Sequence, residues 1–83
     1  MKIYTESFDL QVNGKPLSVV VTPYIVNSTN EKRFRVSYNG SPVHTFIWNE
    51  KERRVHAIND ASHPMPQQIE QAIARELEMR QAA

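Results

Sequence analysis

Apolar and polar residues alternate along most of this chain, and one alternating pattern occurs twice. Residues 8–21 read FDLQVNGKPLSVVV and residues 34–47 read FRVSYNGSPVHTFI, each with Asn-Gly-x-Pro near its centre. Alternation predicts half-buried strands, and Asn-Gly between two such runs is the strongest short-range signal for a two-residue hairpin turn. That turn needs positive φ at both central residues, which Asn tolerates and Gly adopts without steric cost. The sequence therefore predicts two β-hairpins. Their similarity reflects either an ancestral duplication or two independent hairpins that use the same turn residues.

A two-residue turn also sets the register of the first hairpin. Strands are expected over about 3–12 and 15–22, and residues directly opposite one another share a face of the sheet. Pro23 cannot donate a ladder hydrogen bond, so it is expected to end the second strand, to bulge it or to lie at an edge, with residues 24–26 resuming it. The predicted apolar face comprises Phe8, Leu10, Val12, Leu17, Val19 and Val21.

The same turn rule, applied to the second hairpin, predicts strands on both sides of Asn39-Gly40. The third strand is expected over about 33–38, and its partner follows directly after the turn. Residues 49–52 read as the next turn, and a fifth strand is expected over about 53–59. The face predicted to be buried comprises Phe34, Val36, Tyr38, Val43, Thr45 and Ile47.

The periodicity changes near residue 66. Pro66 suits the first position of a helix, where its missing N–H costs nothing. Apolar residues then recur with helical spacing, so one amphipathic helix is predicted over about 66–81, with Glu76 and Arg80 as an i,i+4 pair. The predicted fold is α+β, a single domain spanning residues 1–83. It is an antiparallel meander of four to five strands, with the C-terminal helix packed on one face of the sheet.

A single helix covers one face of a sheet, so the opposite face is the candidate functional surface. An aromatic patch rimmed by arginine is uncommon on a free surface and usually marks a contact. The predicted registers place seven candidate binding residues there or at its rim: Arg33, Arg35, His44, Phe46, Trp48, Arg53 and Val55.

Three interpretations of this surface stay open. A slip of one residue in the last hairpin would exchange the faces of a strand and make Trp48 part of the core. With the predicted register, the patch is a protein interface, most simply between two copies of the chain. The alternative is single-stranded nucleic acid, with bases stacked on Phe46 and Trp48 and phosphates held by arginines. The formal net charge of +1 gives that alternative little support.

Candidate chemistry is sparse. Cysteine is absent, and His44 and His56 fall on opposite predicted faces, so neither a metal nor another cofactor is expected. Ser37 near His44 is a weak candidate for a catalytic pair, and no enzyme activity is expected. No segment resembles a membrane span or a signal peptide, so the expected location is the cytoplasm, without membrane contact.

Overall fold

The computed structural model describes residues 5–26, 28–58 and 64–82. It confirms the predicted α+β meander: all neighbouring strands are antiparallel, and the strands follow one another in sequence order across one sheet. The parts of the predicted strands at residues 3–4 and 59 lie outside the described ranges. The elements are β1 (Glu6–Val12), β2 (Lys15–Val26), β3 (Glu31–Tyr38), β4 (His44–Asn49), β5 (Arg54–Ala57) and α1 (Gln67–Ala82).

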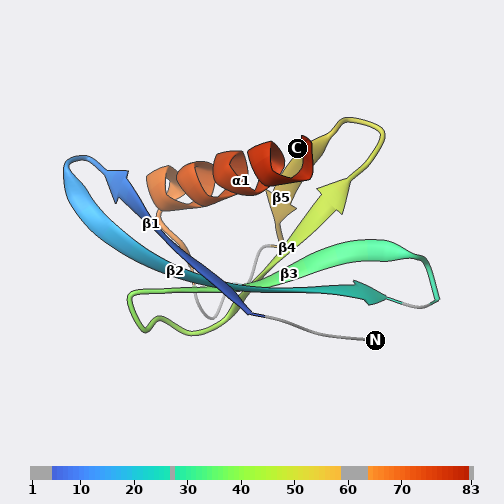
Figure 1. Ribbon diagram of the computed structural model, residues 1–83, viewed down its shortest axis with the longest axis horizontal. Helices are drawn as coiled ribbons and strands as arrows, with labels where there is room; N and C mark the ends of the chain where they lie inside the picture. Colours follow the sequence, from blue (N-terminus) through green and yellow to red (C-terminus); the bar gives the residue numbers. More distant parts are fainter. Residues whose placement is uncertain (1–4, 27, 59–63, 83) are drawn as a thin grey trace.

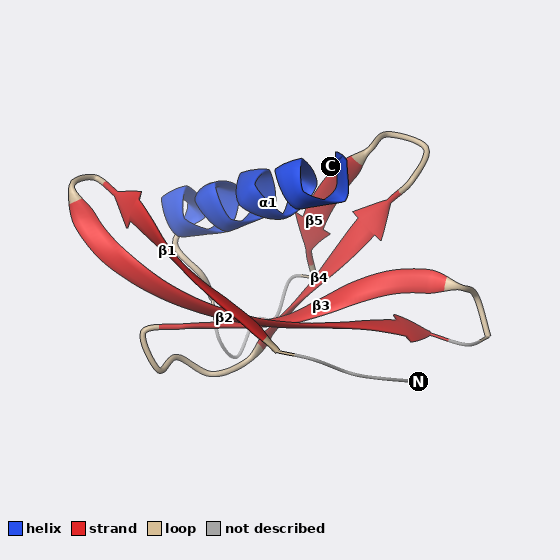
Figure 2. Ribbon diagram, viewed as in Figure 1, coloured by secondary structure: helices blue, strands red, loops and turns tan. Residues whose placement is uncertain are grey.

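The sheet is curled, and α1 lies across its hollow side (Figure 1). The β1–β2 hairpin rises at one end of the view and the β4–β5 hairpin at the other (Figure 2). Contacts join α1 to both edge strands, β5 and β1. The helix therefore closes the space between the two edges of the sheet, and the apolar core lies beneath it.

The first hairpin has the predicted turn and register. Asn13 and Gly14 both have positive φ, 54° and 77°. Beyond them Val12 pairs with Lys15, and this register holds along the whole of β1. Positive φ at both central residues is the type I′ signature, whose twist matches that of the flanking strands.

Strand β2 runs through Pro23 without a break. On one side Pro23 pairs with Phe34 of β3, whereas the pairing of β1 with β2 stops at Glu6 and Val21. The alternation along β2 points the nitrogen of Pro23 toward the β1 side, beyond the last paired residue of β1. The missing N–H therefore breaks no ladder bond among the described residues, and Pro23 does not end β2.

The predicted register of the second hairpin is wrong by one residue. Asn39 and Gly40 form the expected turn, with φ of 48° and 76°. Val36 nevertheless pairs with His44 and not with Val43. One extra residue therefore lies between the turn and β4, and the faces of β4 are exchanged.

Two serines stabilise this offset. The Tyr38 N–H donates to the hydroxyl of Ser41 at 3.1 Å, and the hydroxyl of Ser37 donates to the Ser41 carbonyl at 2.8 Å. The corresponding positions in the first hairpin are Lys15 and Gln11, which have no hydroxyl. Side-chain bonds of this kind satisfy backbone groups that the interrupted ladder leaves without partners.

The offset also improves the core. It turns Phe46 and Trp48 toward α1 and moves Thr45 and Ile47 to the other side of the sheet. Phe46 is fully buried, and burying a phenylalanine contributes about 1.5–3 kcal/mol. The buried cluster comprises Leu17, Val19, Val21, Phe34, Val36, Phe46, Val55, Ile73 and Leu77.

The helix has the predicted apolar stripe, and its polar residues hold the strands on either side. Arg80 pairs with Glu76 at 3.3 Å, as predicted, and also reaches Glu6 of β1 at 3.6 Å. Glu78 accepts a hydrogen bond from the backbone N–H of Val55 at 2.9 Å. This carboxylate caps part of the outer edge of β5.

We expect Phe46→Ala to lower the free energy of unfolding by about 3–5 kcal/mol or to unfold the chain. The matched variant Ile47→Ala changes its neighbour on the other face and should cost only about 1 kcal/mol. Urea denaturation followed by circular dichroism measures both. A larger loss of stability from the change at Ile47 than from the change at Phe46 would support the register predicted from the sequence.

Ser41→Ala removes the acceptor of the Tyr38 N–H and should cost about 1 kcal/mol of stability. Lys15→Ala, at the corresponding position of the first hairpin, should stay within about 0.5 kcal/mol of the parent chain. The same denaturation experiment compares them. Equal effects at the two positions would mean that the hydroxyl does not stabilise the offset.

Candidate interaction surface

The structure divides the seven predicted site residues between two faces and a turn. His44, Phe46 and Val55 are buried on the side that α1 covers, and Trp48 packs partly buried against the same core. Their predicted position on the uncovered face is wrong, because the offset in the second hairpin turned β4 over. Arg33 and Arg35 do lie on the uncovered face. Arg53 lies in the β4–β5 turn with φ of 55°.

The register identifies what the uncovered face does carry. Thr22, Arg35 and Thr45 form one row across β2, β3 and β4, and a second row runs from Tyr24 on β2 to His56 on β5. We call this surface the helix-free face. It comprises Val20, Thr22, Tyr24, Arg33, Arg35, Ser37, Thr45, Ile47 and His56.

Tyr24 is the tyrosine of this face, and the two arginines of β3 lie beside it. The guanidinium carbon of Arg35 lies 5.1 Å from the centroid of the Tyr24 ring. Arg33 is its direct cross-strand partner. The stacked contact restrains the Tyr24 ring and the Arg35 guanidinium. The three residues present a preorganised aromatic and cationic group to solvent.

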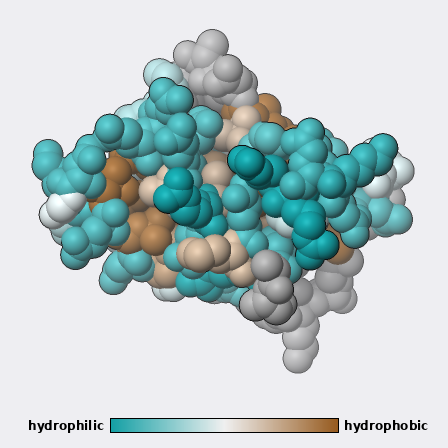
Figure 3. Space-filling model, turned by 90° about the horizontal axis from the view of Figure 1, so that it is seen from above, coloured by the Kyte–Doolittle hydropathy of each residue, from teal (hydrophilic) through white to brown (hydrophobic). Residues whose placement is uncertain are grey.

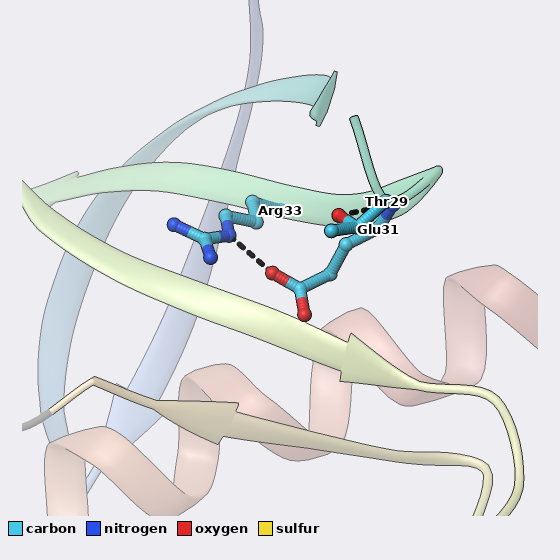
Figure 4. Close-up of polar contacts among 3 residues, drawn as sticks. All are labelled: Thr29, Glu31 and Arg33. Atoms are coloured by element: carbon cyan, nitrogen blue, oxygen red, sulfur yellow. Dashed lines mark hydrogen bonds and ion pairs between the residues drawn. The ribbon is translucent and has the colours of Figure 1, made fainter. Parts of the chain in front are cut away.

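Arg33 is itself held by Glu31. Its Nε donates to the Glu31 carboxylate at 2.5 Å (Figure 4), and the backbone N–H of Glu31 donates to the Thr29 hydroxyl at 3.3 Å. The hydrogen bond that Arg33 donates to Glu31 raises the pKa of the Arg33 guanidinium above its ordinary value. Arg33 therefore keeps its charge at any working pH, while Glu31 neutralises it locally. Arg35 has no carboxylate within ion-pair distance among the described residues.

Apolar side chains accompany this group. Val20 is 41% exposed. It pairs with Ser37 in the row next to that of Arg35 on the helix-free face. Ile47 is partly exposed between Arg33 and His56. Sequence reasoning missed Tyr24 and Ile47 as surface residues. The alternation from Val20 through Thr22 to Tyr24 could have identified the tyrosine, whereas the position of Ile47 depended on the offset.

Catalytic and metal-binding arrangements find no support in the described residues. Ser37 and His44 lie on opposite faces, and His44 stacks on Tyr38 with 5.9 Å between ring centroids. His56 approaches Glu52 at 3.7 Å, but both side chains are more than half exposed. Within ranges 5–26, 28–58 and 64–82, no group of three potential ligands could hold a metal ion. No helix of that described part is long and apolar enough to cross a membrane.

Comparison of the chain with known proteins adds no assignment to this geometry. No family model matches it, no characterised protein matches it, and no solved structure matches it.

Proposed function

We propose that this chain is a small, non-enzymatic interaction module of the cytoplasm that binds a protein partner through its helix-free face. The observation that carries the proposal is the position of Tyr24 on an uncovered sheet surface, where it is stacked by Arg35 and paired across the strands with Arg33. Aromatic residues and arginine are the types that dominate binding energy at protein interfaces. Val20 and Ile47 supply apolar area beside them.

The charge of the face indicates the chemistry of the partner. Glu31 already neutralises Arg33, whereas Arg35 is exposed and stacked only on Tyr24. Two copies of the chain facing each other would bring like guanidinium groups together, which opposes self-association through this face. The best fit is a protein surface with an apolar centre and a carboxylate opposite Arg35.

Single-stranded nucleic acid is the weaker alternative. That reading needed Phe46 and Trp48 as a stacking platform, but Phe46 is fully buried and Trp48 packs against the core. Among the named residues of the helix-free face, Tyr24 is the one phenylalanine, tyrosine or tryptophan on which bases could stack.

Photo-crosslinking in the source cells tests the proposal. A photoreactive phenylalanine derivative in place of Val20 should form a covalent adduct with another protein. The same group at Met79, an exposed apolar residue of α1, is the matched control and should not form that adduct. Adding Arg35→Glu should weaken binding of the purified partner about tenfold or more, a change of about 1.4 kcal/mol.

Three results would overturn the proposal. One is the same set of adducts from both positions, and another is an adduct that nuclease digestion removes. The third is the absence of any adduct between Val20 and a different protein. Circular dichroism of each variant establishes that the fold persists.

A further inference from the structure

The two edges of the sheet differ in how their backbone groups are satisfied. At β5 the outward N–H of Val55 donates to Glu78, so the helix covers this edge. Strand β5 is also short, with four residues against seven in β1. Short, covered edges resist pairing with further strands, whereas long, uncovered edges invite it. Strand β1 is therefore the edge to consider for pairing.

Hydrogen bonds identify which groups of β1 point outward. The Ser18 carbonyl accepts a hydrogen bond from the Asn39 N–H at 2.8 Å, so the backbone N–H and C=O of Ser18 point toward β3. The backbone groups of its neighbour Leu17 therefore point toward β1. Leu17 pairs with Leu10, which places the backbone groups of Leu10 on the β2 side. The backbone groups of Ser7, Asp9 and Gln11 then point away from the sheet. No hydrogen bond to them is recorded within the described part of the chain.

The side chains of β1 are also incompletely covered. Phe8, Leu10 and Val12 face the core, yet each is only partly buried, whereas their partners Leu17 and Val19 on β2 are fully buried. Figure 3 shows apolar surface at the end of the molecule where Figure 1 places the β1–β2 hairpin. An additional strand along β1 would cover this apolar surface and bond the free backbone groups.

We infer that β1 pairs antiparallel with β1 of a second copy, about a two-fold axis at Leu10. In this register Leu10 faces Leu10 of the other copy, Phe8 faces Val12, and Asp9 faces Gln11. The two outward residues, Asp9 and Gln11, then exchange backbone hydrogen bonds across the axis. Apolar pairs meet on the core side, and a carboxylate meets an amide on the helix-free side.

Neighbouring two-fold registers are less favourable. An axis at Asp9 would place two carboxylates directly opposite one another, which is destabilising. An axis at Phe8 would place Glu6 opposite Leu10. The register at Leu10 avoids both conflicts and keeps apolar residues opposite one another on the core side. The resulting assembly is one continuous sheet whose two helix-free faces adjoin.

Single cysteines test this register, because the chain has none of its own. Leu10→Cys should form a disulfide-linked dimer on mild oxidation, since directly opposed residues of this kind have Cα atoms about 4.5 Å apart. Gln11→Cys is the matched control. Its two cysteines would lie diagonally across the strands with Cα atoms about 7–8 Å apart, beyond the roughly 7 Å that a disulfide spans, so it should form no disulfide-linked dimer.

Sedimentation velocity measures the same contact without a covalent link. The parent chain should shift from its 9.6 kDa monomer toward dimer as concentration rises. Asp9→Pro removes an outward N–H without breaking the β1–β2 ladder and should abolish the shift, whereas Asp9→Asn should retain it. A parent chain that stays monomeric, or equal disulfide formation at positions 10 and 11, would overturn the inference. Neither result affects the crosslink at Val20, so the two proposals fail independently.

Discussion

The offset between β3 and β4 is the constraint on which the rest of the structure depends. Pairing Val36 with His44 directs Phe46 and Trp48 into the hollow of the sheet, where Ile73 and Leu77 of α1 meet the core. Without the offset, Thr45 and Ile47 would occupy those positions and the core would lose the aromatic side chains of Phe46 and Trp48. Burial of Phe46 against the helix thus couples a local feature of one turn to the packing of the whole domain.

The helix acts through its polar residues as well as its apolar stripe. Arg80 stacks on Phe8 at 4.4 Å and pairs with Glu6, so it holds one end of β1. Gln68 accepts a hydrogen bond from Asn13 at the other end of that strand. On the opposite flank Glu78 bonds to the backbone of β5. The helix therefore holds a strongly curled sheet from both edges, but only β5 has a recorded backbone cap from it.

The offset of β4 and the position of the helix determine which side chains the helix-free face presents. Turning β4 over removed the large aromatic residues from the helix-free face and left Tyr24 there, beside Arg33 and stacked by Arg35. The face is consequently smaller in aromatic area than the sequence predicted, and its character is cationic and mixed apolar. A protein partner with a complementary carboxylate suits that surface better than stacked bases.

Much of the fold follows from local chemistry in the sequence. Asn-Gly turns require positive φ, alternation assigns the first hairpin, and helical spacing with Pro66 places α1 within a residue of its observed start. The choice between two faces for β4 could not follow from alternation, because both of its faces read as apolar: Val43, Thr45 and Ile47 on one, Phe46 and Trp48 on the other. Only tertiary packing decided between them, since burying the larger aromatic side chains under α1 is favourable and Ser37 and Ser41 satisfy the backbone at the offset. Arg33 and Arg35 were therefore placed correctly on β3, whereas His44, Phe46, Trp48 and Val55 depended on a packing choice that no local pattern contains.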